Sequence, residues 1–438
     1  MHIRAAASLI ELRIRIVLRC SSYSHKKRGA MVTTEDMAAS AAAGDGAMRK
    51  TTCVTGGSGH IASVLVKICC WRNSVPGELQ SSDHRGHGVG GGRRWDYEEE
   101  DGVRHRRQRV HRVGAAQDAA VEGVRREDHH DAEKNVHLKA LAALGPLEVY
   151  RADLGEEGSF DHALAGCDYV FLVAAPVNLN PENPESAAAV SSRPLEGDGH
   201  VLDEESWSDV EFLGSTKTGP WSYSVSKVLV EKAARAFAEE KGVSLVTVCP
   251  VVTVGEAPAA DALAGVGLVL SLLSGRCEAD APDGSGACEA PAGGGPFPDI
   301  TLGGGNLAGG AVPLPAMIER SAAVMLEHIQ RASGAVSMVH VDDLCRAELF
   351  VAEEEAASGR YIVSSVNATA VELARFLAAK YPQYNVDTDR FRDLPEMPRV
   401  CVSSAKLVKA GFEYKYKTLD EIYDNVVEYG RATGILPH

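Results

Sequence analysis

The sequence has no Cys-x-x-Cys pair, no long apolar run and no excess of basic residues. Its ten cysteines are scattered from Cys20 to Cys401, which favours ordinary thiols in a reducing compartment over a metal site or a disulfide framework. The longest largely apolar run, residues 262–273, is shorter than the about 20 residues of a transmembrane helix. The net charge of -15 argues against a nucleic-acid partner, because phosphate binding needs a basic surface. We therefore expect a soluble, cytoplasmic protein with no bound metal.

The first 48 residues are expected to form a disordered extension. Residues 1–30 carry seven Arg and Lys against one acid, Glu11. An Arg-rich, acid-poor N-terminus is typical of an organelle transit peptide, which would place the protein outside the cytoplasm. The other interpretation, which we favour, is an upstream extension in front of a start at Met31.

The rest of the chain is predicted to fold as an α/β protein, because 45% of its residues are apolar and 24% charged. Residues 49–255 are expected to form a Rossmann-type dinucleotide-binding domain, a doubly wound parallel sheet. Residues 256–438 are expected to form a smaller substrate lobe. Residues 72–130 and 277–316 bury too little apolar surface to offset the entropy of ordering, so both are predicted to be disordered insertions. Six histidines in the first insertion suggest a metal site as the alternative, but no His-x-x-x-His spacing supports it.

A strand, a glycine turn and a helix are predicted in succession over residues 51–70. The turn reads Thr-Gly-Gly-Ser-Gly from Thr55 to Gly59. Glycine lets the backbone approach a pyrophosphate closely, and the start of the helix offers free N–H groups and a positive dipole end. A plain tight turn would have a similar sequence, but the placement between strand and helix favours dinucleotide binding.

Tyr223 and Lys227 are spaced for one face of a helix that is predicted over residues 223–241. A free tyrosine has a pKa of about 10 and is a poor acid at neutral pH. A neighbouring ammonium group stabilises the tyrosinate, which lowers the pKa and makes the phenol a usable proton donor. The same spacing is found on ordinary amphipathic helices, so its weight comes from the glycine turn earlier in the chain.

Three further polar positions have two interpretations each. Ser186 opens a run of small residues, where a hydroxyl would either position a substrate oxygen or have no role of its own. Asp153 directly follows a predicted strand and suits either an adenine contact or a helix cap. Residues 340–343, His-Val-Asp-Asp, are expected to be a strand end and helix cap that ties the lobes together, with a metal site as the alternative.

Together these motifs resemble the extended short-chain dehydrogenase/reductases. More narrowly, the chain is similar to the plant dihydroflavonol reductase group and, within it, to the anthocyanidin reductases. The signature of the neighbouring cinnamoyl-CoA reductases is absent. The similarity covers about 270 of the 438 residues, in segments 54–63, 149–160, 165–178, 186–213, 219–255, 339–353 and 357–363 and from residue 380 to the C-terminus.

The resemblance implies an oxidoreductase of flavonoid biosynthesis that uses NADPH to reduce anthocyanidins, small-molecule flavonoids, to 2,3-cis-flavan-3-ols. By position it implies Ser186, Tyr223 and Lys227 as the catalytic triad. It implies Ser191 as a substrate contact. The cofactor contacts that it implies are Thr55, Gly56, Gly59, His60, Ile61, Asp153, Leu154, Val173, Ala174, Tyr223, Lys227 and Pro250.

Departures from the family lead us to expect the loss of two sheet elements. The family's second strand ends in an Arg that receives the 2′-phosphate of NADPH, and residues 72–130 stand in its place. The family also has a helix and a fifth strand before the catalytic serine, and about 30 residues are missing before Ser186. Losing central strands would expose sheet edges and cost more than the roughly 5–15 kcal/mol by which domains are stable.

These departures keep three functional hypotheses open. The first is the anthocyanidin-reducing enzyme, with Tyr223 as proton donor. The second is an oxidoreductase like dihydroflavonol 4-reductase, which residues 186–213 favour less. The third is a catalytically defective dinucleotide-binding variant, which the missing strand before Ser186 favours.

Overall fold

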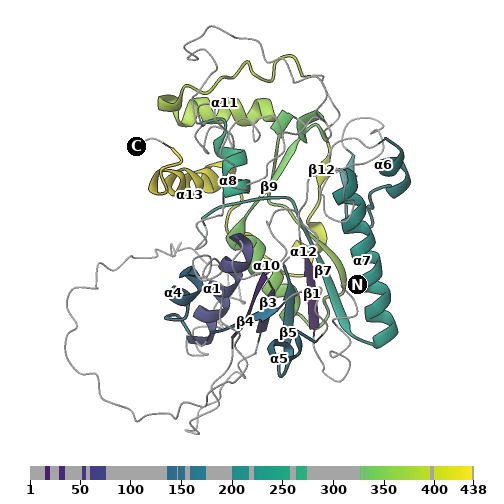
Figure 1. Ribbon diagram of the computed structural model, residues 1–438. Coiled ribbons are helices and arrows are strands. Elements are labelled where there is room, and N and C mark those ends of the chain that lie inside the picture. Colours follow the sequence, from purple (N-terminus) through teal and green to yellow (C-terminus); the bar gives the residue numbers. More distant parts are fainter. Residues whose placement is uncertain are drawn as a thin grey trace, which may run out of the picture.

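The computed structural model describes residues 15–19, 29–34, 52–55, 60–74, 136–145, 147–152, 158–173, 200–216, 221–256, 263–273, 326–394 except 328 and 332, and 399–436. The described elements form a seven-stranded, a three-stranded and a two-stranded sheet, with helices around them (Figure 1). Among these helices, none is both long and apolar enough to cross a membrane.

The seven-stranded sheet has the order β10-β7-β1-β5-β3-β2-β4. All neighbouring strands are parallel except β2, which is antiparallel to both β3 and β4. The carboxyl ends of the parallel strands therefore meet at one edge of the sheet. The strands are β1 (Arg15–Arg19), β2 (Gly29–Thr34), β3 (Thr52–Thr55), β4 (Glu148–Ala152), β5 (Tyr169–Leu172), β7 (Ser244–Pro250) and β10 (Gly359–Val363).

The N-terminal extension occupies both places in the sheet that we expected to be empty. A Rossmann sheet has the order 3-2-1-4-5-6, in which β3 is the first strand, β4 the third, β5 the fourth and β7 the sixth. β1 lies between β5 and β7, in the place of the fifth strand, and β2 lies between β3 and β4, in the place of the second. The expectation of disorder over residues 1–48 is therefore wrong at these two segments. The missing strands are replaced from elsewhere in the chain.

β1 is suited to the centre of a parallel sheet because it is apolar on both faces. Ile16, Val17 and Leu18 are all buried. Val17 pairs with Phe171 of β5 on one side and Val246 of β7 on the other, and these three residues belong to one apolar cluster. The alternate residue Ile16 faces the opposite cluster. A continuous apolar run of this kind is what a strand covered on both faces requires.

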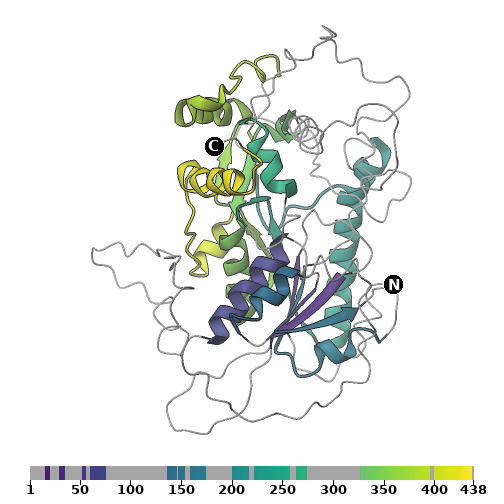
Figure 2. The ribbon, with the colours of Figure 1, turned by 60° about the vertical axis from the view of Figure 1, so that its left-hand side comes forward.

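Helices cover both faces of this sheet. α1 (His60–Ser74), α4 (Val136–Leu141) and α10 (Val341–Glu353) pack on one face, over the cluster that contains Val17. α5 (Asp161–Leu164) packs against the cluster on the opposite face. The long helix α7 (Trp221–Lys241) also lies on the side away from α1, as Figures 1 and 2 both show.

The smaller lobe lies beyond the carboxyl edge of the main sheet, at the top of Figure 1. Its sheet has the order β11-β9-β8, and its apolar core is filled by side chains such as Tyr423, Met338 and Leu273. Thr369 and Thr418 begin α11 and α13 with capping boxes. The elements are β8 (Val252–Val254), β9 (Val336–His340), β11 (Val366–Ala368), α8 (Leu263–Leu270), α11 (Ala370–Lys380), α13 (Leu419–Ala432) and the short 3₁₀ helix η4 (Pro382–Tyr384).

Two chain crossings connect these parts. The chain divides after Pro250, because β7 belongs to the main sheet and the next strand, β8, to the smaller one. The two-stranded sheet pairs β6 (Val201–Leu202) with β12 (Cys401–Val402). α6 (Val210–Thr216) precedes α7, and α12 (Ala405–Lys409) follows β12. Of the two predicted insertions only residues 72–74, the last of α1, are among the described residues.

Candidate active site

The carboxyl edge of the main sheet is held together by Thr55, the last residue of β3. Its buried hydroxyl donates to the carbonyl oxygen of Phe171 at 3.3 Å and accepts from the backbone N–H of Val173 at 3.1 Å. These two bonds fix the ends of β3 and β5 side by side. The Thr55 hydroxyl therefore faces the end of β5, at the edge of the sheet where a dinucleotide binds in Rossmann folds.

α1 begins at this edge, directly after the glycine turn. Its first residue is His60, and the carbonyl oxygen of Ile61 accepts a hydrogen bond from the Cys345 thiol of α10 at 3.6 Å. α1 is fifteen residues long and has no acidic residue in its first turn. The first turn of α1 therefore has no acidic side chain of its own to oppose the positive dipole end of the helix.

α7 carries the predicted Tyr-Lys pair. Tyr223 and Lys227 both lie within the helix, and the Lys227 side chain is half-buried. Ser224, Val228 and Ala238 form the buried stripe of the same helix. Tyr223 and Lys227 each precede a residue of this stripe by one position. The pair therefore lies beside the helix face that packs on the sheet.

Several predicted site residues cannot be placed with the rest. Of the cofactor contacts, the structure describes Thr55, Ile61, Val173, Lys227 and Pro250, and it places His60 and Tyr223 by their backbone only. Thr55, Val173 and Pro250 lie at or directly after the carboxyl ends of β3, β5 and β7. Outside the described residues lie Gly56, Gly59, Asp153, Leu154, Ala174, Ser186 and Ser191.

The His-Val-Asp-Asp block is structural, as predicted. His340 caps α10 by accepting the backbone N–H of Asp342 on Nδ1 at 3.2 Å, and its Nε2 lies 2.9 Å from Oδ1 of Asn425. The buried carboxylate of Asp343 accepts the backbone N–H groups of Lys415 and Tyr416, both at 2.8 Å. The block therefore joins α10 to the C-terminal segment.

The neutral imidazole satisfies both of these contacts at once. Nδ1 serves as acceptor while Nε2–H donates to Asn425, a tautomer inferred from the partners. The ring is also stacked on Tyr416 with centroids 3.6 Å apart. Burial lowers the pKa of His340 to about 4, although the hydrogen bond to Asn425 opposes the shift. His340 is therefore uncharged at neutral pH.

Sequence reasoning missed one polar group near α7, the ion pair between Glu231 and Arg360. Glu231 falls in the buried stripe of α7, seven residues after Ser224 and seven before Ala238. An acidic residue at an apolar position of a helix is a readable signal, because carboxylates are rarely buried without a partner. The partner itself, on a strand 129 residues later, could not be read from the spacing.

The class of protein follows from these features. A parallel sheet in Rossmann order carries a glycine turn and a helix start after its first strand, and a Tyr-Lys pair on the helix before its sixth. This arrangement defines a dinucleotide-binding oxidoreductase.

Comparison with known proteins identifies the family. No family model matches the chain. The chain is 35% identical over 419 residues to anthocyanidin reductase ((2S)-flavan-3-ol-forming) of Vitis vinifera, which covers 89% of this chain and 97% of that protein. It is 34% identical over 340 residues to anthocyanidin reductase of Arabidopsis thaliana, covering 70% of this chain and 87% of the relative. Dihydroflavonol 4-reductase of Arabidopsis thaliana is 32% identical over 327 residues, with coverages of 66% and 70%.

Among solved structures, vestitone reductase from alfalfa is 26% identical, with a TM-score of 0.46 and coverage of 65% of this chain and 82% of that one. From the sequence relatives, the chain belongs to the anthocyanidin reductase family of the extended short-chain dehydrogenase/reductases. It is an NAD(P)H-dependent reductase that acts on flavonoids.

Proposed function

We propose that this chain reduces anthocyanidins to 2,3-cis-flavan-3-ols with NADPH as the hydride source. The observation that carries the proposal is similarity along nearly the whole length of an anthocyanidin reductase, since the match covers 97% of that relative. The dihydroflavonol reductases match a smaller share of the chain at lower identity. β1 and β2 occupy the sheet positions of the two missing strands, which supports a chain that can fold.

The chain's own residues would bind and orient the reactants as follows. The glycine turn with Gly56 and Gly59 and the first N–H groups of α1 hold the pyrophosphate, at the edge of the sheet beside Thr55. Pro250 and Val173 line the cofactor cleft at the ends of β7 and β5. The residues that flank the turn fit a dinucleotide, because the helix N-terminus carries no competing acid.

Tyr223 acts as the proton donor and Lys227 lowers its pKa. Ser186 orients a substrate oxygen, and Ser191 contacts the substrate beside it. Bound NADPH supplies hydride, and the balance from a flavylium cation to a flavan-3-ol requires two hydrides and one proton. Asp153 and Leu154 hold the adenine, and Ala174, His60 and Ile61 complete the contacts to the cofactor.

A substrate panel tests this assignment. Purified full-length protein with NADPH is given an anthocyanidin such as cyanidin in one reaction and a dihydroflavonol in another, and products are separated by chiral chromatography. The proposal expects a flavan-3-ol from the first and no reduction of the second. Reduction of the dihydroflavonol alone would support the second hypothesis, and cofactor binding without any product would support a defective variant.

The preference for NADPH over NADH has a candidate source in β2. Because β2 is antiparallel, its first residue, Gly29, lies at the carboxyl edge of the sheet, paired with Ala152 at the end of β4. Two residues later, Met31 pairs with Thr55 at the end of β3. In Rossmann sheets this corner, beside the glycine turn, is where an Arg accommodates the 2′-phosphate of NADPH.

We propose NADPH rather than NADH as the cofactor. Fluorescence titration of the purified chain with each cofactor checks this, and tighter binding of NADPH is the expected result. Equal affinities for the two cofactors would contradict the preference.

We propose that the protein is cytoplasmic. No disulfide joins the seven cysteines within the described residues, as expected in a reducing compartment. A fluorescent protein fused to the C-terminus should distribute through the cytoplasm. Accumulation in an organelle would instead support the transit-peptide interpretation of residues 1–30.

A further inference from the structure

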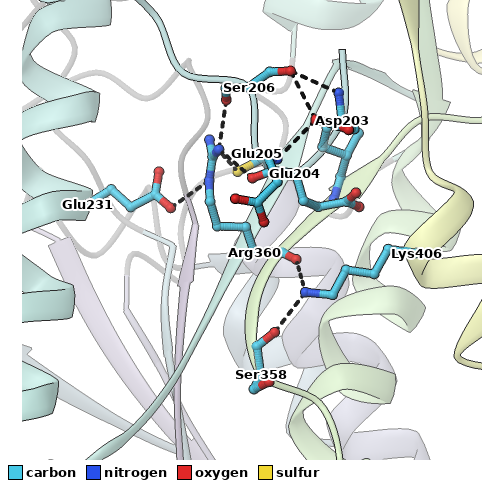
Figure 3. A network of polar contacts seen from close by, with 10 residues as sticks. Asp203, Glu204, Glu205, Ser206, Glu231, Ser358, Arg360 and Lys406 are labelled. Carbon is cyan, nitrogen blue, oxygen red and sulfur yellow. Dashed lines mark hydrogen bonds and ion pairs between the residues drawn. The ribbon is translucent and has the colours of Figure 1, made fainter. Parts of the chain in front are cut away.

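Arg360, on the edge strand β10, connects three parts of the fold through its guanidinium group (Figure 3). Its Nε lies 2.9 Å from Oε1 of Glu231 on α7. Its Nη1 donates to the carbonyl oxygens of Glu204 and Ser206, both at 2.8 Å. The guanidinium carbon lies 4.0 Å from the centroid of the Trp207 ring. One side chain therefore joins the sheet, the helix that carries the Tyr-Lys pair, and the loop of residues 203–207.

The acidic partner is buried in the helix face that packs on the sheet. Glu231 is 2% exposed and shares the buried stripe of α7 with Ser224, Val228 and Ala238. Burying a carboxylate at such a position costs desolvation free energy, and an apolar side chain would avoid this cost. The ion pair also limits the distance between its two partners, whereas apolar contacts tolerate sliding. The pair therefore locates α7 on the sheet more narrowly than packing alone.

Arg360 is held in place by its own surroundings. The Lys406 ammonium donates to the carbonyl oxygens of Ser358 at 2.8 Å and Arg360 at 2.7 Å, which fixes this end of β10. The Glu204 carboxylate accepts the backbone N–H of Ile362 at 3.1 Å, so the loop is bound to the same strand. The loop is braced internally by a hydrogen bond between Ser206 and Asp203. The guanidinium group of Arg360 is therefore held in a fixed position beside Glu231.

We propose that Glu231 and Arg360 are positioning residues for the reaction, which set the rotation and height of α7 and with them the place of Tyr223 and Lys227. Lys227 lies four residues before Glu231, which is roughly 6 Å along the helix axis. Tyr223 lies eight residues before Glu231, which is roughly 12 Å along the axis. A helix transmits a rotation or shift at one residue to its neighbours two turns away. This inference rests on the proposed function, since it concerns the same Tyr-Lys pair.

The variant that tests the inference is Glu231→Gln, which keeps the shape of the side chain and removes its charge. Its control is Glu239→Gln, an exposed acid on the same helix eight residues later. Arg360→Lys keeps a cation but loses the planar fork and should have a smaller effect in the same direction. Each variant is assayed for NADPH affinity, kcat and KM as a function of pH, and unfolding by urea.

A second readout does not depend on turnover. Tyrosinate absorbance is titrated in each variant with and without Tyr223→Phe, and the difference reports the pKa of Tyr223 alone. In Glu231→Gln this pKa should rise towards its usual value of about 10, because a rotation of α7 moves Tyr223 and Lys227 out of the site together and water then weakens the effect of Lys227 on the phenol. We expect kcat to fall roughly 10- to 100-fold, as for a reacting group displaced by about 1 Å. NADPH affinity should fall by a smaller factor, because Tyr223 and Lys227 are only two of the predicted cofactor contacts.

The outcomes separate the inference from the proposed function. A raised Tyr223 pKa with lowered kcat in Glu231→Gln, and neither change in Glu239→Gln, supports it. The contrary result is an activity loss no larger than the unfolded fraction of the variant, together with an unchanged pKa of Tyr223. It would show that the pair only stabilises the fold, and it would overturn the positioning role. If Tyr223→Phe itself retains full activity, the proposed role of Tyr223 fails and this inference fails with it.

Discussion

Replacing Val17 tests whether the N-terminal extension is part of the sheet. Val17 is 1% exposed and lies between Phe171 and Val246 in the centre of the sheet. Val17→Ala removes two methyl groups, each about 0.8 kcal/mol of burial, and leaves a cavity, so we expect a loss of about 2–3 kcal/mol in the free energy of unfolding. The matched control is Val201→Ala in strand β6, where the side chain is 54% exposed. It should change the free energy of unfolding by less than about 0.5 kcal/mol.

Deletion of residues 1–24 is the stronger form of the same test. It removes Ile16, Val17 and Leu18 from the core, which together contribute about 5–9 kcal/mol at 1.5–3 kcal/mol for each buried side chain. This loss is comparable with the whole stability of a typical domain, so the truncated chain should not fold. The assay is urea unfolding followed by circular dichroism. A truncated chain with an unchanged midpoint, or equal effects of the two Val→Ala variants, would refute the placement of β1.

Two further predictions concern the block that joins the lobes. Because burial depresses the pKa of His340 from its unfolded value of about 6.5 to about 4, its contribution to stability is complete above pH 6.5 and is lost as the pH falls towards 4. The loss is roughly 3 kcal/mol, and His340→Gln should flatten the dependence of the urea midpoint on pH over that window; an unchanged slope would contradict the assignment. Asp343→Ala leaves the backbone N–H groups of Lys415 and Tyr416 without their acceptor and should cost about 3–5 kcal/mol, against less than about 0.5 for the exposed Asp393→Ala. Equal urea midpoints for the two variants would show that the carboxylate does not join the segments.

Local pattern was enough to predict most of the central elements. The strand predicted before the glycine turn is β3, and the helix predicted after the turn is α1. The helical spacing around Tyr223 became α7, two residues longer at its start than predicted. In each of these segments the apolar period and the end signals agree, so the local preference matches the final fold.

The origin of the second and fifth strands could not be predicted, because it depends on contacts distant in sequence. Residues 15–19 are only three apolar residues flanked by two arginines, and nothing local distinguishes them from a targeting segment. Their place in the sheet depends on the gap between β5 and β7, which exists only when residues 169–172 and 244–248 lie one strand apart. The partner of Glu231 was missed for the same reason, since Arg360 reaches it from another strand. The short pair of β6 and β12 has too few residues to show a period.

The measurement that tests the account most directly is anthocyanidin-dependent oxidation of NADPH by the purified full-length chain, beside its Tyr223→Phe variant. The account predicts turnover to a flavan-3-ol by the native chain, and a loss of roughly 10²- to 10⁴-fold in the variant with NADPH still bound. A folded, NADPH-binding chain that turns over no anthocyanidin, or a variant as active as the native chain, would contradict it.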